Sequence, residues 1–319
     1  MYTQELELDK KEVILIMFKN QKQTKFALLL AFIFILFYIH DIINKEKLSI
    51  TNKNFIKENS TLIKEDLTLV TGFYKIKSKH SFNSYIQWVN TILKINKPII
   101  FFINPKLSHL VKRKRSVKLY NKTKWIELEL KDFYTYKNYL KYFKETNPLD
   151  EEKNIHSIEL YCVWAEKVVF LKKAIEDNPF NSTCFYWIDA GYFRKKYYDQ
   201  NFLVNWPSTK RCKEEPRITF ISMRQLALDE IQNFQTLNMA LSFFRSTNVG
   251  GNFFGGTAFY ILEFYKKYFQ ALEKWNKYLF FIGKDQNLFA YVIFLNPEYC
   301  KLVYPGKYGR WFFSMKYFL

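Results

Sequence analysis

The chain has 319 residues, of which 49% are hydrophobic and 20% aromatic, and this composition excludes a disordered protein. Its formal net charge of +19 would suit an anionic partner, but only eight of its 49 basic residues are Arg, on which readers of nucleic-acid bases depend. Since Lys, Asn, Ile, Phe and Tyr are abundant together, we interpret the charge as a codon bias and do not expect a nucleic-acid partner.

One long hydrophobic segment stands near the N-terminus. Phe26 to Ile39 is unbroken and apolar, and its extension to Ile43 gives 18 residues, about 27 Å of helix, which is close to the thickness of a thin bilayer. After an N-terminal tail, residues 1–25, we therefore predict a transmembrane signal anchor over 26–43 and a polar, Lys-rich stem over 44–65. A cleaved signal peptide and a buried core helix are the alternatives, although no small-residue cleavage pattern follows the run.

The anchor predicts a single-pass membrane protein and, in a eukaryotic cell, an endomembrane protein of the Golgi or ER with a lumenal C-terminal domain. Equal numbers of lysines flank the segment, so the positive-inside rule does not fix its orientation. In an oxidising lumen the four cysteines, Cys162, Cys184, Cys212 and Cys300, allow up to two disulfides in three pairings.

Residues 66–319 predict a single α/β domain. Apolar or β-branched runs predict strands at 67–74, 98–104, 125–130, 182–189 and 217–223. Apolar residues spaced by three and four predict helices at 85–94 and 161–177, a long helix through Leu262 and Leu272, and a shorter helix from Asp285. Such alternation predicts a mostly parallel sheet with helices on both faces. The basic run 111–118 has no interleaved aromatic residues, and we expect it to be a solvated loop.

The carboxylate of Asp189 ends a strand that is otherwise apolar. Open α/β sheets bind ligands at the carboxyl ends of their strands, and Ala190 and Gly191 turn the chain there. A carboxylate in this place could hold a hard divalent cation, Mg²⁺ or Mn²⁺, that bridges phosphate groups. The alternative is an aspartate that only caps the turn.

Two further segments carry candidate residues. The stretch 248–257 contains Gly250, Gly251, Gly255 and Gly256, and paired glycines let a backbone approach a sugar or phosphate closely. A tight structural turn before the long helix is the alternative. Asp285 and Gln286 precede a helix, where Asp285 could act as a base toward an acceptor, as an acceptor ligand or as an N-cap.

In order along the chain, LVTGFY, WAEKVVFLKKAIEDNPFNSTCFYWIDAGYFR, GGNFFGG and GKDQN resemble the HtrL/YibB-like proteins, a group of glycosyltransferase-A-like character. The resemblance runs from about Leu67 to Tyr291 and leaves out the predicted anchor. It implies a nucleotide-sugar transferase fold in which the strand ending in Asp189 takes the place of the usual Asp-x-Asp metal motif. Here residue 191 is Gly rather than a second Asp, so metal coordination would need another ligand or be absent.

The resemblance and the chemistry of the side chains together suggest roles for individual residues. Asp189 would be the metal ligand and, with Asp285, a catalytic residue. The residues expected to bind the donor are Lys167, Arg194, Gly250, Gly251, Gly255, Gly256 and Gln286. Lys167 would neutralise a donor phosphate, with a solvated helix face as the alternative, and Arg194 would clamp a pyrophosphate through two hydrogen bonds.

These observations predict a membrane-anchored glycosyltransferase. It would move a sugar from a nucleotide-sugar donor to a glycan or lipid-linked acceptor, with a divalent cation if one is present. The alternative is a non-catalytic, membrane-tethered protein of the same fold that binds a glycan or a nucleotide.

Overall fold

A computed structural model describes residues 66–195, 197–225, 248–306 and 310–319, all of which belong to one compact unit. The predicted tail, anchor and stem, residues 1–65, lie outside the described residues. Within the described ranges, no helix combines the length and the apolar character that a membrane span requires.

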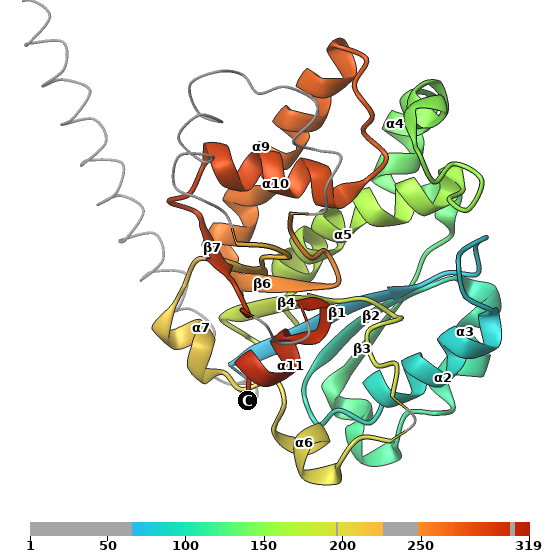
Figure 1. Cartoon of the computed structure of the whole chain (residues 1–319). Helices are drawn as coiled ribbons and strands as arrows, with labels where there is room; N and C mark the ends of the chain where they lie inside the picture. The colour runs from blue at the N-terminus through green and yellow to red at the C-terminus, as the bar shows by residue number, and fades with distance from the viewer. Residues whose placement is uncertain (1–65, 196, 226–247, 307–309) are drawn as a thin grey trace, which may run out of the picture. The chain divides into compact units, whose positions relative to one another are not determined.

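Seven strands form one mixed sheet in the order β3-β2-β1-β4-β6-β5-β7 (Figure 1). The strands are β1 (Leu67–Phe73), β2 (Ile99–Ile103), β3 (Thr123–Glu127), β4 (Cys184–Ile188), β5 (Ile218–Ile221), β6 (Phe253–Thr257) and β7 (Cys300–Val303). Of the six neighbouring pairs in this described sheet, four are parallel, and β6 runs antiparallel to both β4 and β5. The fold is therefore a single-sheet mixed α/β domain, as the alternating pattern predicted.

Helices cover both faces of the sheet. They are α2 (Phe82–Ile92), α3 (Pro105–Lys112), α4 (Tyr134–Thr146), α5 (Ile158–Asp177), α6 (Gln200–Asn205), α7 (Lys210–Glu214), α9 (Ala258–Lys277), α10 (Asp285–Leu295) and α11 (Ser314–Tyr317). Short 3₁₀ helices span Val117–Lys122, Leu130–Asp132, Asn147–Leu149 and Arg310–Phe312.

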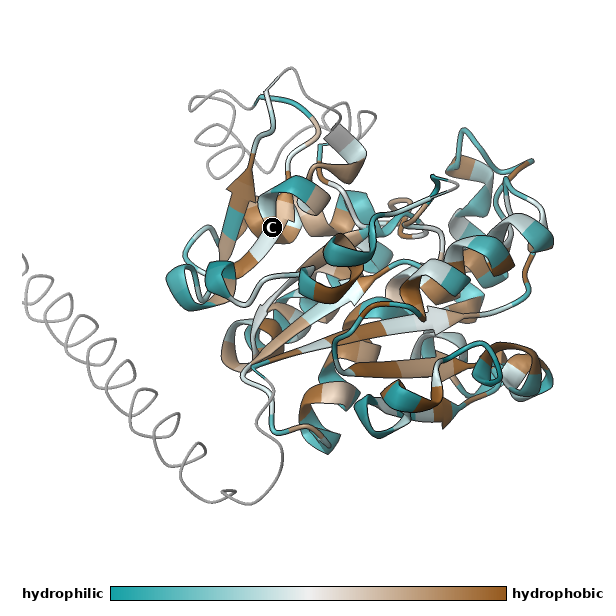
Figure 2. Cartoon of the chain, turned by 90° about the horizontal axis from the view of Figure 1, so that it is seen from below, coloured by the Kyte–Doolittle hydropathy of each residue, from teal (hydrophilic) through white to brown (hydrophobic). Residues whose placement is uncertain are grey.

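Neighbouring residues of the central strands enter two different cores. Tyr186 packs with residues of α2, α3 and α6, whereas Trp187 packs with residues of α4, α5, α9 and α10. This alternation follows from the pleat of a strand, which sends successive side chains to opposite faces. Because both faces are covered, the central strands are mostly apolar, with the buried Thr68 and Thr71 in β1 as exceptions, and Figure 2 shows them in brown to white between helices that carry teal segments.

Strand β6 contains the second glycine pair, which the sequence had grouped with a loop. It lies between β4 and β5, and a Cβ atom on Gly255 would come within 2.1 Å of the Phe185 carbonyl oxygen. A Cβ atom on Gly256 would come within 2.7 Å of the Arg217 carbonyl oxygen. The pair is therefore explained by the close approach of strand backbones inside the sheet.

The basic run 111–118 is only in part the solvated loop that its composition predicted: most of its residues are exposed, but Arg115 is buried. Arg115 is only 2% exposed, and its guanidinium donates hydrogen bonds to the carbonyl oxygens of Leu93, Ile95 and Lys97 at 2.8–3.2 Å. These carbonyls follow the end of α2 and need donors, which is why a charged side chain is buried here. Burial lowers the pKa of Arg115 to about 10.

One disulfide joins Cys184, the first residue of β4, to Cys212 in α7. Cys162 and Cys300 are buried free thiols. Of the two bridges that the sequence allowed, the described part of the chain forms one.

Candidate functional site

The carboxyl end of β4 brings two of the predicted motifs together. Ile188 at the end of β4 is in register with Phe253 at the start of β6, so Asp189 leaves the sheet where the first glycine pair enters it. The Asp189 amide donates a hydrogen bond of 2.9 Å to the Asn252 carbonyl oxygen. The antiparallel direction of β6 therefore places residues 250–252 at the same sheet edge as the carboxyl ends of β1, β2 and β4.

A buried lysine lies at the centre of this edge. Lys167, on α5, is 3% exposed, and its Nζ is 3.0 Å from Oδ1 of Asp189 and 2.8 Å from Oδ2 of Asp285. The same ammonium group donates a hydrogen bond of 2.9 Å to the Gly251 carbonyl oxygen. Four of the residues predicted for the site thus form one cluster from four separate segments, which we call the Lys167 cluster: Lys167, Asp189, Gly251 and Asp285.

Electrostatics keep this lysine charged. Burial alone would lower the pKa of Lys167, but the charges of Asp189 and Asp285 outweigh burial and raise the pKa above its ordinary value. Its charge is already balanced by two protein carboxylates. The predicted contact between Lys167 and a donor phosphate would therefore need an ion pair to open.

Asp189 is the partly open member of the cluster, with 31% of its side chain exposed. Its Oδ1 faces Lys167 and accepts a hydrogen bond of 2.6 Å from Trp187 Nε1. No described residue makes a hydrogen bond or ion pair with Oδ2. Trp187, which the sequence reasoning did not select, lies two positions before Asp189 and hence on the same face of the strand, which is the signal that could have identified it.

Asp285 is the enclosed member, with 4% of its side chain exposed. It is the first residue of α10, and its Oδ1 accepts a hydrogen bond of 2.8 Å from the Gln286 amide. Burial raises the pKa of Asp285, and the adjacent Lys167 offsets only part of this rise. A Cβ atom on Gly251 would lie 2.9 Å from Asp285 Oδ2, so the glycine leaves room for the carboxylate.

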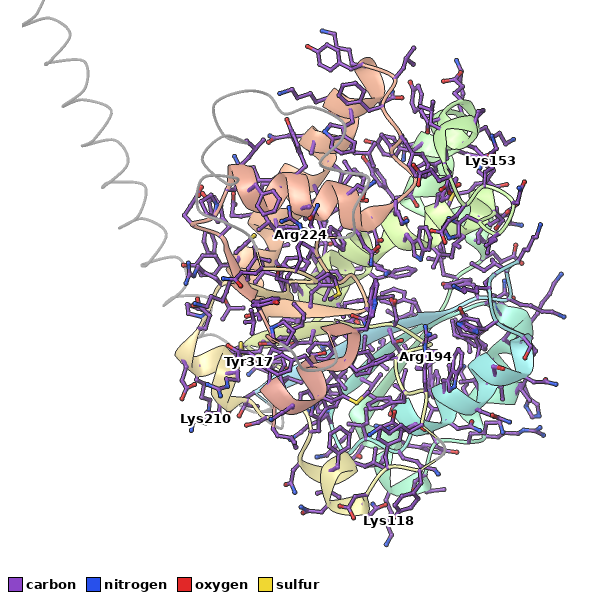
Figure 3. The ribbon with its side chains drawn as sticks, viewed as in Figure 1. Lys118, Lys153, Arg194, Lys210, Arg224 and Tyr317 are labelled. Carbon is purple, nitrogen blue, oxygen red and sulfur yellow. A yellow bond between two sulfur atoms is a disulfide. The ribbon has the colours of Figure 1, made fainter. Side chains whose placement is uncertain are left out.

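Arg194 lies beyond the turn that follows Asp189 and is labelled in Figure 3. Its exposed guanidinium is 5.1 Å from the ring centre of Trp88 and 5.7 Å from that of Phe312, and Nε donates to the Gly191 carbonyl oxygen at 3.1 Å. Stacking on two rings fixes the group while most of its N–H donors remain free of the contacts described here.

The other predicted donor-binding residues lie apart from the Lys167 cluster or contact it only through the backbone. Gly250 packs against Met223, whose Cε would be 2.7 Å from an added Cβ. Gly255 and Gly256 lie inside the sheet, and Gln286 meets the cluster through its backbone amide. Contact between these four residues and a donor stays a prediction.

The geometry fits a divalent cation in one limited way. Among the described residues, no three His, Cys, Asp or Glu side chains gather as a metal site. Asp189 is 31% exposed and its Oδ2 has no hydrogen bond or ion pair to a described residue, whereas Asp285 is occupied by Lys167. This arrangement suits a cation that takes one ligand from the protein and the rest from phosphate oxygens and water, as Mg²⁺ often does.

Among the cavities in the described part of the chain are two of about 500 and 370 Å³, and Asp189 lines neither of these two. The smaller lies beside α3 and includes His109, Lys112 and Glu127. The larger lies between the ends of α9 and α10 and is considered below.

A single mixed sheet with a charged cluster at the carboxyl ends of its strands defines an α/β protein, and open α/β sheets bind ligands at this kind of edge. The family model described as "Bacterial protein of unknown function (HtrL_YibB)" matches residues 58–319, and the chain belongs to this family. The resemblance predicted from the sequence motifs is thereby confirmed. No curated protein matches the chain. Among solved structures, core-mannan synthase A from Aspergillus fumigatus, in a manganese and GDP form, has a TM-score of 0.45 and 10% identity over 78% of this chain and 75% of that chain.

Proposed function

We propose that this protein is a glycosyltransferase that moves a sugar from a nucleotide-sugar donor to a glycan or lipid-linked acceptor. The observation that carries the proposal is the Lys167 cluster, in which Asp189 presents one free carboxylate oxygen at the carboxyl edge of the sheet. Donor phosphates bind at such edges in open α/β folds, where loops from several strands meet.

Each charged residue has a separate part in the proposed reaction. A divalent cation held by Asp189 Oδ2 would supply positive charge to the donor diphosphate and to the leaving nucleotide. Lys167 holds Asp189 in one orientation, and the exposed guanidinium of Arg194 binds the diphosphate from the other side of the turn. The role of Asp285 as a base toward the acceptor hydroxyl requires its ion pair with Lys167 to open.

The proposed location is a membrane, through the apolar segment 26–43, with the catalytic domain in an oxidising compartment. The disulfide between Cys184 and Cys212 supports this location, since such bonds persist mainly in secreted and lumenal proteins.

A non-catalytic binding protein is the second candidate, and one observation favours it. Lys167 and Asp285 neutralise each other inside the protein, as in a purely structural ion pair. Turnover of a nucleotide-sugar donor distinguishes the glycosyltransferase from the non-catalytic binding protein.

The test is release of nucleoside diphosphate from a panel of nucleotide sugars by the full chain, with Mn²⁺ or Mg²⁺ present. Asp189→Asn should reduce hydrolysis of the active donor by about a hundredfold, because the variant loses the anionic oxygen at the diphosphate. Its melting temperature should stay close to that of the wild type. The matched control is Asp177→Asn, at an exposed carboxylate paired only at 3.9 Å with Lys124. Full activity in Asp189→Asn would exclude the proposed role of Asp189.

A further inference from the structure

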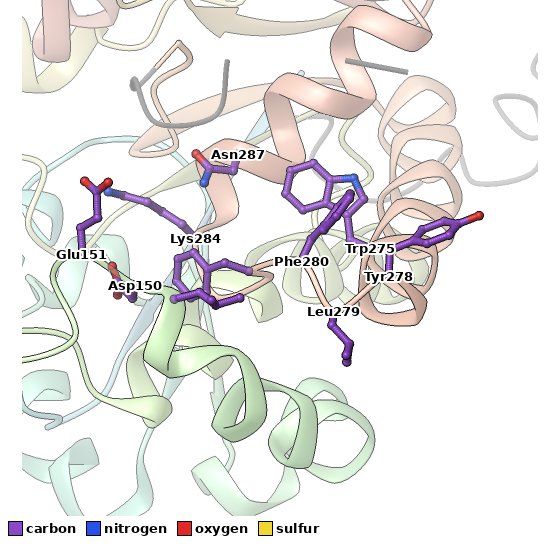
Figure 4. Close-up of a pocket in the computed structure, with 10 residues that line it drawn as sticks. Asp150, Glu151, Trp275, Tyr278, Leu279, Phe280, Lys284 and Asn287 are labelled. Carbon is purple, nitrogen blue, oxygen red and sulfur yellow. The ribbon is translucent and has the colours of Figure 1, made fainter. Parts of the chain in front are cut away.

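The larger cavity, of about 500 Å³, lies where the end of α9 and the start of α10 face the segment after the 3₁₀ helix Asn147–Leu149 (Figure 4). Aromatic side chains, among them Trp275, Tyr278 and Phe280, form one side of the cavity. Asp150 and Glu151 stand on the opposite side in the same view. The volume lies within the usual range for small-molecule sites.

The acidic wall of this cavity is rigid. The Asp150 side chain is 3% exposed, and its Oδ2 accepts a hydrogen bond of 2.5 Å from the Tyr161 hydroxyl and is 2.8 Å from His156 Nδ1. Its Oδ1 accepts the Glu152 amide at 2.9 Å. Lys284, at the start of α10, pairs with Glu152 Oε2 at 3.0 Å and so ties the two walls together. The shape of the cavity is therefore largely set before a ligand arrives.

The rim of the cavity includes an unusual backbone conformation. Leu279 has φ of 55° and is 66% exposed, and Tyr278 beside it is 57% exposed. This left-handed residue ends α9 in a common way, since the Phe280 amide donates a hydrogen bond of 3.0 Å to the Trp275 carbonyl oxygen. The helix end thus fixes the backbone that carries Tyr278 into the lining of the cavity.

The chemistry of the lining selects among ligand classes. Asp150 and Glu151 against Lys284 give the cavity a net charge of −1, in a chain whose overall charge is +19, and this disfavours phosphates and other anions. Asp150 and Lys284 already have partners within the protein, whereas Glu151 and the Asn287 amide also face the cavity, and an alkyl chain could satisfy neither of these two groups. A neutral ligand with an apolar face and many hydroxyl groups meets both conditions, because each hydroxyl can donate and accept.

We propose that this cavity is a saccharide subsite, which binds one neutral sugar unit of the acceptor against Tyr278 and Phe280. The statement that this sugar unit belongs to the acceptor rests on the proposed function. The binding of a sugar in the cavity does not. Its link to the Lys167 cluster is short: Lys284 and Asn287 line the cavity, and Asp285 between them lies in the cluster. The first turn of α10 therefore connects the sugar subsite with the proposed reaction centre.

The test measures binding of methyl glycosides of glucose, galactose, mannose and N-acetylglucosamine to the full chain by saturation-transfer NMR and titration. At least one glycoside should receive saturation at its ring protons. Tyr278→Ala should weaken that binding by about tenfold, the loss expected for one aromatic contact. The matched control is Tyr120→Ala, at a tyrosine that is 47% exposed and lines neither cavity, and it should bind like the wild type.

Three results would overturn the subsite: no glycoside binds, Tyr278→Ala binds as tightly as the wild type, or glucose 6-phosphate binds better than methyl glucoside. Because the assay contains no nucleotide sugar, its outcome is independent of donor hydrolysis. A chain that binds glycosides through Tyr278 but releases no nucleotide keeps the subsite and loses the proposed function. If the chain hydrolyses a donor but binds no glycoside, the proposed function is kept and the subsite is excluded.

Discussion

Lys167 is the residue on which the candidate site depends most. A fully buried ammonium group is costly unless paired, and here it is paired with two carboxylates and a carbonyl oxygen. Its neighbour Glu166 is equally buried and accepts hydrogen bonds from the amides of Tyr134 and Thr135 at the start of α4. Adjacent residues of α5 thus serve two purposes: Glu166 stabilises the scaffold and Lys167 holds the site.

Replacing Lys167 with Met should lower the free energy of unfolding by about 3–5 kcal/mol, because it leaves a buried carboxylate without its cation. Chemical denaturation of the full chain measures this loss. Lys172→Met is the matched control, since Lys172 lies on the same helix, is 32% exposed, pairs with Glu176 and otherwise only faces the Tyr265 ring at 5.7 Å. A loss in Lys167→Met no larger than that in the control would show that the cluster contributes nothing to stability.

The loss of unfolding free energy caused by Lys167→Met should also depend on pH, and it should become smaller as the pH falls. Burial raises the folded-state pKa of Asp285 above its ordinary value of 3.8, and removal of Lys167 takes away the main opposing influence. In the folded variant Asp285 then binds a proton more readily than in the unfolded chain, so its stability rises as pH falls through the folded pKa. Unfolding midpoints of variant and wild type, compared from neutral pH downward, should therefore converge, and a constant difference would contradict the assignment.

The sequence singled out Lys167, Asp189 and Asp285 but not their mutual contacts. Asp189 was identifiable because a lone carboxylate at the end of an apolar strand has few structural explanations. The pairing with Lys167 was not, because periodicity gives the face of a helix but not the strand against which that face packs. The partners come from α5, β4 and α10, which only the sheet order brings together.

At the scale of elements, Arg115 joins the end of α2 to the turn before β2. Arg115→Ala should lower the free energy of unfolding by about 3 kcal/mol or more, because several buried carbonyl oxygens would lose their donor. Arg113→Ala, in the same basic run but exposed, should change stability by less than about 0.5 kcal/mol. Equal effects in thermal or urea unfolding would show that Arg115 acts only as surface charge.

Elements were predictable where their signals are local. Apolar runs located β1, β2, β4 and β5 to within a few residues, and helical spacing located α5 and α9. Helix α4 was missed, because its start has no local capping side chain and is capped instead by Glu166 from α5. Strand β6 was taken for a loop, since its glycines are required by neighbouring strands that the local sequence does not reveal.

At the scale of the whole molecule, the disulfide can be tested by counting the free thiols of the four cysteines. Alkylation of the denatured protein without reductant should modify two thiols, Cys162 and Cys300, and reduction should raise the number to four. Mass spectrometry of peptides checks both numbers. If four thiols were modified without reductant, the disulfide would be absent. The argument for an oxidising compartment would then lose its support.

The sharing of one ammonium group by Asp189 and Asp285 has a consequence for the history of the family. A relative that loses only the lysine at position 167 keeps a buried carboxylate without its cation, which destabilises the fold. A relative in which the lysine and the carboxylates are replaced together by neutral residues avoids this cost. Across descendants these three positions should therefore change as a set, and members in which all three are neutral should lack the donor hydrolysis proposed for this protein.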